Sequence, residues 1–244
     1  MINSNKTLNK SNILAVILAK ENSMGLKNKN IRLLNKKPLI YWPINAAKKS
    51  KFIKKIVVST DSFKIKKIAE QNAAIVPFMR PKHLSRSDSS SVDCVIHCLD
   101  FFKNKKILFD YVVLLEPTSP LTTYKDIDKA LRKLHNNRKN SSSIVGVSKN
   151  INYHPSFSVK IKKDGKIKPY LDKFKTIRRQ SISPLYFFDG TIYISKVDAI
   201  IKKKTFYHNK TLAYITHKYQ SFEIDDIVDH ICVEAVFKNL DKIK

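Results

Sequence analysis

The chain has 244 residues, of which 43% are hydrophobic and 10% aromatic, so it is long enough to bury a sizeable core and does not have the composition of a disordered chain. Its longest strictly apolar run, residues 13–19, is far shorter than the roughly 20 residues that a membrane-spanning helix needs. No charged and then apolar segment resembles a signal peptide. We therefore expect a soluble, cytoplasmic protein with no membrane partner.

The charge balance is strongly basic, since 47 Lys and Arg residues against 20 Asp and Glu residues give a formal net charge of +27. Such an excess raises nucleic acid as a partner. The basic residues are spread along the whole chain, however, and no zinc-finger spacing or RNP-type aromatic motif accompanies them. We therefore favour solvated lysines on an ordinary enzyme over a basic nucleic-acid-binding protein.

The three cysteines, Cys94, Cys98 and Cys232, do not have the paired spacing of a zinc site or of a secreted disulfide framework. An odd number of thiols fits a reducing compartment. Cys94 and Cys98 lie four positions apart in an apolar helical pattern, and we expect both to face the core rather than to bind metal.

Short apolar segments alternate with helical patterns along the first 150 residues. Buried strands are predicted at residues 12–19, 55–59, 74–78, 111–115 and 143–148. Helices are predicted at residues 38–50, 62–72, 90–102 and 124–135. This alternation predicts an α/β fold with a doubly wound, mostly parallel sheet. Ligands bind beyond the carboxyl ends of such strands, where the loops at 20–30, 59–61 and 116–122 should gather.

The two ends and the middle of the chain differ from this pattern. Residues 1–11 are polar and without periodicity, so we expect a flexible tail followed by a single domain over residues 12–244. Residues 151–188 contain a turn at Asp164-Gly165 and several aromatic side chains, and they resemble an insertion. Strand patterns return at 191–195 and 212–216, and a last helix is predicted over 226–239. Pro43 should strain or kink the helix at 38–50.

The first loop, residues 19–31, follows the first predicted strand directly and has the sequence AKENSMGLKNKNI. Its lysines and backbone amides could surround a triphosphate. It lacks the Gly-Lys-Ser/Thr ending of a Walker loop. Composition alone would favour a solvated basic loop.

Seven segments in chain order resemble the CMP-N-acylneuraminate (sialic acid) synthetases, or acylneuraminate cytidylyltransferases. Residues 15–34 are similar to the signature loop of that family, A-R-x-x-S-K-G-x-x-x-K-N. The other segments are VVSTDS at 57–62, FMRP at 78–81, SSSVD at 89–93, LLEPTSPL at 114–121, RRQ at 178–180 and DGTIYI at 189–194. The resemblance spans about residues 13–236, nearly the whole chain.

This resemblance implies a Rossmann-like fold of the nucleotide-diphospho-sugar transferase type, with a dimerisation and sugar-contact insertion at 151–188. It implies a homodimer that transfers CMP from CTP to the anomeric hydroxyl of a sialic-acid-type nonulosonate and releases pyrophosphate. The implied nucleotide contacts are Ala19, Lys20, Asn22, Ser23, Lys29, Asn30, Arg80, Ser90 and Ser91. The implied sugar contacts, some of them from the partner subunit, are Glu116, Arg178, Gln180, Phe187 and Phe188. The residues expected to act in catalysis are Lys20, Lys29 and Asp225.

The family's Asp-x-Asp metal motif corresponds here to Glu223-Ile224-Asp225. Residues two apart on an extended segment point to the same side, so Glu223 and Asp225 could share one ion. Mg²⁺ prefers hard oxygen ligands and commonly takes one or two carboxylates together with substrate phosphates. The alternative is a solvated acidic pair in which Asp225 caps the last helix.

Four positions depart from the family pattern. Lys20 replaces an arginine and loses its bidentate fork, and Met24 replaces a lysine expected to stabilise the leaving pyrophosphate. Glu223 is one methylene longer than aspartate, and Thr122 stands where arginine is common. These changes keep open a second hypothesis, a weakened or non-catalytic nucleotide-binding homologue. The motifs do not distinguish neuraminate, legionaminate and pseudaminate, and they contain no obvious general base.

Overall fold

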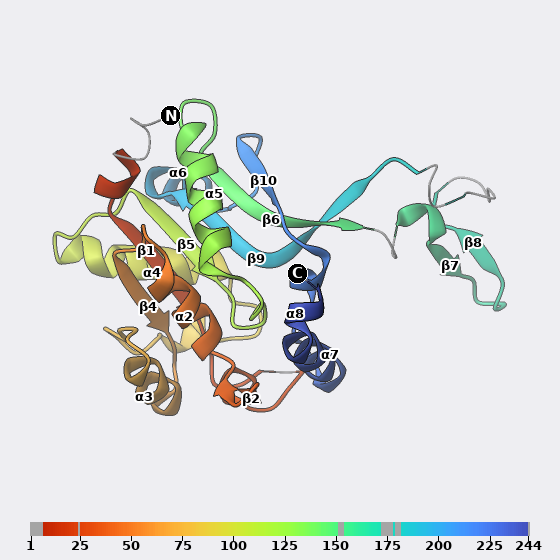
Figure 1. Ribbon diagram of the computed structural model, residues 1–244, viewed down its shortest axis with the longest axis horizontal. Coiled ribbons are helices and arrows are strands. Elements are labelled where there is room, and N and C mark those ends of the chain that lie inside the picture. Colours follow the sequence, from red (N-terminus) through yellow and green to blue (C-terminus); the bar gives the residue numbers. More distant parts are fainter. Residues whose placement is uncertain (1–6, 24, 151–153, 172–177, 179–181, 244) are drawn as a thin grey trace.

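The centre of the protein is a six-stranded sheet with the order β10-β6-β9-β5-β1-β4 (Figure 1). The computed structural model describes residues 7–23, 25–150, 154–171, 178 and 182–243. The strands of this sheet are β1 (Ile13–Leu18), β4 (Lys55–Ser59), β5 (Tyr111–Leu115), β6 (Ser143–Asn150), β9 (Leu185–Lys196) and β10 (Thr211–Ile215). Only β9 runs antiparallel to its neighbours, β5 and β6, among these strands. The predicted mostly parallel α/β sheet is therefore confirmed.

Helices cover both faces of this sheet. One face is covered by α2 (Tyr41–Lys49), α3 (Phe63–Gln71) and α5 (Tyr124–Asn136), and the other by α4 (Ser91–Asn104) and α6 (Val197–Lys203). The side chains of β1 alternate between the two faces of the sheet. Ile13, Ala15 and Ile17 pack against the helices on the first face, and Leu14 and Val16 pack against those on the second. All five side chains are fully buried, which explains the continuous apolar run.

The C-terminal helices pack beside the first loop. The elements that meet there are β2 (Leu33–Leu34), β3 (Lys37–Pro38), α7 (Ile227–Lys238) and α8 (Leu240–Ile243). Leu34 and Val233 belong to one buried cluster, and the ring centroids of Trp42 and Phe237 are 4.4 Å apart. This packing brings the segment before α7 next to the loop that follows β1.

Two predicted elements differ from the structure. The first helix begins at Tyr41 rather than at residue 38, so Pro43 lies in its first turn. Backbone N–H groups in a first turn have no helical partner, and the expected kink is wrong. The strand predicted at 74–78 is reduced to a single parallel bridge between Val57 and Ile75, because Pro77 has no N–H to continue the ladder.

Part of the predicted N-terminal tail is packed. Residues 7–10 are helical, and Leu8 is only 1% exposed within the core beneath α2 and α5. The Thr7 hydroxyl lies 2.8 Å from Nε2 of His135. The expected flexible tail therefore does not include residues 7–10. The predicted single domain over 12–244 stays a prediction.

A slender arm projects from the body (Figure 1). β6 and β9 pair as far as Asn150 and Leu185, and the described residues beyond them form a hairpin of β7 (Val159–Ile161) and β8 (Ile167–Pro169). The described residues of the predicted insertion at 151–188 fall on this arm. β9 is longer than the predicted strand at 191–195, since it continues outward to Leu185 as the base of the arm.

The remaining helix predictions agree with the structure. Cys94 and Cys98 are buried in α4, as the apolar spacing indicated. The helices predicted at 62–72, 124–135 and 226–239 are present within one or two residues at each end. None of the helices in the described part of the chain is long and apolar enough to cross a membrane.

Candidate active site

A cavity of about 290 Å³ opens beyond the carboxyl ends of β1 and β5, where the sheet topology predicts a ligand site. Charged and small polar side chains dominate its wall. The lining residues are Leu18, Lys20, Ser23, Gly25, Lys29, Asn30, Arg80, Leu84, Arg86, Ser89, Ser91, Cys94, Glu116, Pro117, Thr118 and Asp225. Four segments far apart in sequence thus meet in one place: the first loop, residues 80–94, the 116–118 turn and the segment before α7.

The first loop is fastened to the end of β4. The Ala19 N–H donates to the Ser59 carbonyl over 3.0 Å, and the Glu21 N–H donates to Oδ1 of Asp61 over 2.8 Å. Across the loop, Nδ2 of Asn30 donates to the Lys20 carbonyl over 2.8 Å. Asn30 is buried, so one role of its amide is to hold Lys20 at the cavity.

Arg80 provides a fixed positive charge. It is 6% exposed, its Nε donates to Oγ of Ser59 over 3.0 Å, and a terminal nitrogen donates to the Ser59 carbonyl. Within the described residues, Arg80 forms no ion pair. The charge is therefore available to an anionic ligand in the cavity.

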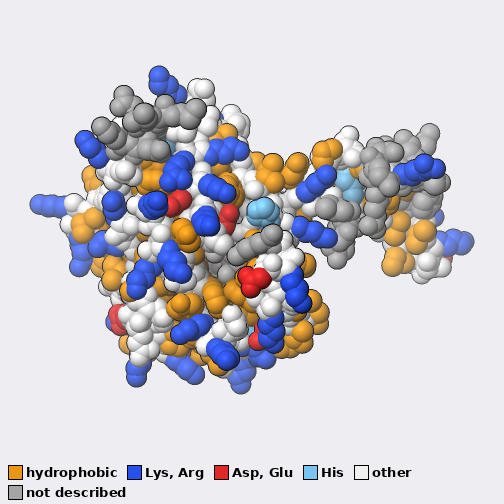
Figure 2. Space-filling view, in the orientation of Figure 1, with side chains coloured by type: hydrophobic (Ala, Val, Ile, Leu, Met, Phe, Trp, Pro, Cys, Tyr) orange, Lys and Arg blue, Asp and Glu red, His pale blue; other side chains and the backbone are white. Residues whose placement is uncertain are grey.

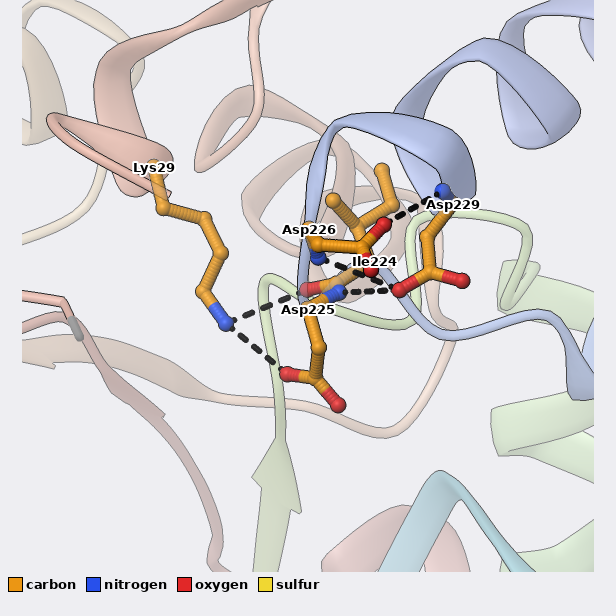
Figure 3. Close-up of polar contacts among 5 residues, drawn as sticks. All are labelled: Lys29, Ile224, Asp225, Asp226 and Asp229. Atoms are coloured by element: carbon orange, nitrogen blue, oxygen red, sulfur yellow. Dashed lines mark hydrogen bonds and ion pairs between the residues drawn. The ribbon is translucent and has the colours of Figure 1, made fainter. Parts of the chain in front are cut away.

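Lys29 joins the first loop to the segment before α7 (Figure 3). Its Nζ donates to Oδ1 of Asp225 over 3.0 Å and to the Ile224 carbonyl over 3.1 Å. The Ile224 N–H donates in turn to the Thr118 carbonyl over 2.8 Å. Gly25 completes the contact, because a Cβ there would stand 2.4 Å from the Asp225 carbonyl oxygen. The first loop, the 116–118 turn and the segment before α7 are thus held together by the Lys29 side chain and by one backbone hydrogen bond.

Asp226, rather than Asp225, caps α7. The Asp226 side chain accepts from the N–H groups of Val228 and Asp229, at 2.8 and 3.0 Å, in a reciprocal capping box with Asp229 (Figure 3). The alternative role of Asp225 as the N-cap is wrong. Its carboxylate contacts Lys29 and remains 74% exposed at the cavity, where it is free to take a further ligand.

Negative charge is concentrated beside these cations. Burial, and then the neighbouring Glu223 carboxylate, raise the pKa of Glu116 to about 7, against the opposing effects of Arg80 and Lys29. Burial also raises the pKa of Glu223, and the carboxylates of Asp225 and Asp189 raise it further. A cation placed among these groups would be stabilised by them.

The donor set suits a magnesium ion shared with a ligand. Glu223 and Asp225 supply hard carboxylate oxygens, and the Asp225 carboxylate is open to solvent. No three His, Cys, Asp or Glu side chains of the described residues are close enough together to enclose a metal. A site with two carboxylates is what Mg²⁺ uses when phosphate oxygens and water complete its coordination, so the residues present fit this ion.

Eight of the predicted site residues line the cavity: Lys20, Ser23, Lys29, Asn30, Arg80, Ser91, Glu116 and Asp225. Ala19 is buried beneath it and Asn22 is exposed outside the lining. Ser90 is instead the N-cap of α4, where its hydroxyl accepts from the Val92 N–H over 3.2 Å. Glu223 does not line the cavity, and its carboxylate lies against Gly190.

Of the other predicted sugar contacts, those within the described residues do not line this cavity. Phe187 and Phe188 are exposed on β9 at the base of the arm, where the Phe188 ring is 4.4 Å from that of Tyr207. Arg178 is exposed. Gln180 lies outside the described residues, as does Met24. The assignment of these residues to the sugar stays a prediction.

Thr122, one of the departures from the family pattern, points into the fold. It is 7% exposed, and its hydroxyl donates to the Thr191 carbonyl over 3.1 Å. It does not line the cavity. Thr122 therefore contributes to the packing of the fold and not to the cavity wall.

Sequence reasoning missed half of the lining. The residues not anticipated are Leu18, Gly25, Leu84, Arg86, Ser89, Cys94, Pro117 and Thr118. Gly25, Pro117 and Thr118 lie inside motifs that the sequence comparison had already identified, so their position was a usable signal. Arg86 is one of 47 basic residues, and nothing in its neighbourhood distinguishes it.

Comparison with known proteins agrees with this geometry. Residues 14–240 match the family model described as Cytidylyltransferase. The chain is 36% identical to the CMP-N,N'-diacetyllegionaminic acid synthase of Legionella pneumophila, over 93% of this chain and 96% of that protein. It is 31% identical to the N-acylneuraminate cytidylyltransferase of Escherichia coli, over 90% of this chain and 51% of that protein.

A solved structure of CMP:2-keto-3-deoxy-manno-octonic acid synthetase complexed with CTP shares the fold. It superposes with a TM-score of 0.70 at 13% identity and covers 94% of this chain and 100% of that one. The family match, the relatives at 36% and 31% identity and the conserved architecture confirm the resemblance drawn from the seven motifs. This chain belongs to the cytidylyltransferase family.

Proposed function

We propose that the protein transfers CMP from CTP to the anomeric hydroxyl of a nonulosonic acid and releases pyrophosphate. The observation that carries this proposal is the cavity at the strand ends, in which Lys20, Lys29 and Arg80 face the carboxylates of Glu116 and Asp225. Cations suited to a triphosphate and carboxylates suited to a metal and a sugar thus line one cavity, in a chain of the cytidylyltransferase family.

The first loop is the proposed binding site of the triphosphate. Both Lys20, at the start of this loop, and Lys29, near its end, line the cavity. The Asn30 side chain keeps the Lys20 backbone in place. Arg80 adds a charge that is held rigidly against Ser59. Fixed cations stabilise the charge that develops on the leaving pyrophosphate, because they need not reorganise during the reaction.

Glu223 and Asp225 are the proposed holders of Mg²⁺, which would neutralise the phosphates and polarise the α-phosphorus. Lys29 donates both to Asp225 and to the Ile224 carbonyl. It therefore fixes this segment and supplies a second positive charge beside it.

Glu116 is the proposed acceptor of the sugar's proton. It lines the cavity, and its pKa of about 7 is the value at which a carboxylate acts as an efficient base at neutral pH. The anomeric oxygen would attack the α-phosphorus, the bond to pyrophosphate would break, and the hydroxyl proton would pass to Glu116.

A homodimer is proposed from the arm. Val159, Ile161, Ile167 and Tyr170 are between 46% and 78% exposed on its hairpin, and exposed apolar side chains on a projecting element are typical of a subunit interface. Phe187 and Phe188 lie at the base of the same arm. A partner subunit there would bring further residues to the sugar.

The test is pyrophosphate release from CTP and Mg²⁺ with N,N'-diacetyllegionaminic acid, N-acetylneuraminic acid and pseudaminic acid in turn. The legionaminic acid is tried first because the synthase of Legionella pneumophila shares 36% identity. Release that depends on one of these sugars is expected. Folded protein that binds CTP but releases no pyrophosphate with any of them would overturn the proposal in favour of the non-catalytic homologue.

A further inference from the structure

The hydroxyl of Ser119 is a buried polar group without a hydrogen-bond partner in the described part of the chain. Ser119 is 2% exposed and lies in the turn that follows β5. Its backbone is satisfied, since its N–H donates to the Glu116 carbonyl over 3.1 Å and its carbonyl accepts from the Thr122 N–H over 3.3 Å. Burying an unpaired hydroxyl costs folding free energy, so this group needs an explanation.

The Glu223 carboxylate lies beside this hydroxyl, at the Cα of Gly190. Gly190 separates the two, and a Cβ on Gly190 would stand 1.5 Å from Oε1 of Glu223 and 3.0 Å from Oγ of Ser119. Both oxygens therefore converge on the space that a side chain at position 190 would fill. Ser119 has a proton to donate there, and a carboxylate is an acceptor.

The backbone keeps the two residues together. The Ile224 N–H donates to the carbonyl of Thr118, the residue before Ser119, over 2.8 Å. Lys29 fixes the same segment through the Ile224 carbonyl. Both oxygens lie within 3.0 Å of one point, the position of a Cβ on Gly190, so a change of the Glu223 rotamer is the movement that a hydrogen bond to Ser119 requires.

We propose that Ser119 is a positioning residue for Glu223, and that its hydroxyl donates a hydrogen bond to the Glu223 carboxylate when that carboxylate binds the metal. This inference rests on the proposed function, which assigns Mg²⁺ to Glu223 and Asp225. Donors behind a ligating carboxylate orient it and strengthen metal binding. Glutamate has one more rotatable bond than aspartate, and the Ser119 hydroxyl would restrict that additional freedom.

The experiment compares Ser119→Ala with Ser143→Ala. Ser143 is also buried, but its hydroxyl donates to the Phe206 carbonyl over 2.9 Å, and it does not line the cavity. In urea without metal, Ser119→Ala should unfold at the same or a higher midpoint than the wild type, because it removes an unpaired group. Ser143→Ala should unfold at a lower midpoint.

Mn²⁺ serves as the metal probe, titrated onto the CTP complex without sugar, so that no turnover occurs. The dissociation constant should rise about tenfold in Ser119→Ala and remain unchanged in Ser143→Ala. In a Glu223→Ala background, the Ser119 substitution should have no further effect, because the acceptor of the hydrogen bond has been removed.

Two results would overturn the inference: an Mn²⁺ dissociation constant that Ser119→Ala leaves unchanged, or a loss of stability as large as that of Ser143→Ala. The first would remove Ser119 from the metal site, and the second would assign its hydroxyl to the fold. Failure of the proposed function is distinguishable, since it appears as wild-type protein that releases no pyrophosphate with any sugar.

Discussion

Glu116 and Glu223 are far apart in the chain, yet in the folded protein burial, and then the Glu223 carboxylate, raise the pKa of Glu116. The sequence identified both residues from their motifs but could not indicate this effect, because it depends on the Ile224 to Thr118 hydrogen bond that joins their segments. Folding thereby raises the pKa of the Glu116 carboxyl from its usual 4.5 to about 7.

The raised pKa of Glu116 predicts a pH dependence of stability. The folded protein holds this proton more tightly than the unfolded chain, in which the pKa is near its usual 4.5. The free energy of unfolding should therefore fall as the pH rises from about 4.5 to about 7. Urea unfolding at pH 5 and pH 8 should show a decrease about 2 kcal/mol larger for the wild type than for Glu116→Gln. Equal decreases would contradict the burial of this charge.

The same residue predicts a pH dependence of activity. If Glu116 accepts the sugar's proton, only its ionised form is active, so kcat/KM should rise with pH and level off above about 7. Glu116→Gln should lose this rise together with most of the turnover. A Glu116→Gln enzyme with the wild-type profile would assign the proton to another acceptor.

At the scale of elements, β9 shapes the site through one residue. Gly190 has a positive φ of 66°, and it allows Glu223 to lie directly against its Cα. The motif DGTIYI gave no reason to expect this contact. It arises because β9 runs antiparallel between β5 and β6, which places its residues beside the 116–119 turn.

Gly190→Ala should therefore affect both stability and activity. The positive φ alone costs roughly 1–2 kcal/mol for a residue with a Cβ, and displacement of Glu223 should lower kcat/KM by about tenfold or more. Gly165→Ala is the matched control, because it also has a positive φ, of 79°, but has no atom within 4 Å of the added Cβ. Denaturation measures the stability of the two variants, and steady-state kinetics measures their kcat/KM. Equal activity in Gly190→Ala and Gly165→Ala would contradict the proposed effect of Gly190 on Glu223.

The strands that the sequence predicted most directly are those whose burial is continuous. β1 is buried on both faces, so its apolar run has one interpretation. The strand predicted at 74–78 and the helix predicted at 38–50 differ from the structure because one proline in each, Pro77 and Pro43, decides where the strand ends or how the helix begins. The arm could be predicted as a change of composition, whereas its projection from the body depends on the long pairing of β6 with β9.

At the scale of the whole molecule, the basic residues are dispersed. Figure 2 shows Lys and Arg side chains over the visible face of the body and on the arm rather than in one patch. This distribution agrees with solvated lysines on an enzyme, and the cavity draws its specific cations from Lys20, Lys29 and Arg80.

The arm predicts the state of association. Ile161→Asp places a charge on a side chain that is 78% exposed, so the monomer fold should be unaffected while an interface covering it should not form. Sedimentation velocity should show a dimer for the wild type and a monomer for the variant. Asp164→Asn, in the turn of the same hairpin, is the control and should remain dimeric. A monomeric wild type would refute the proposed interface.

The central claim is that sugar-dependent CMP transfer takes place at the cavity where Lys29 meets Asp225. The most direct measurement is the rate of pyrophosphate release from CTP with and without the nonulosonic acid, for the wild type and Asp225→Asn in parallel. We predict release by the wild type only when the sugar is present, and a loss of about a hundredfold or more in the variant. Sugar-independent release, or equal rates in the two proteins, would contradict the account.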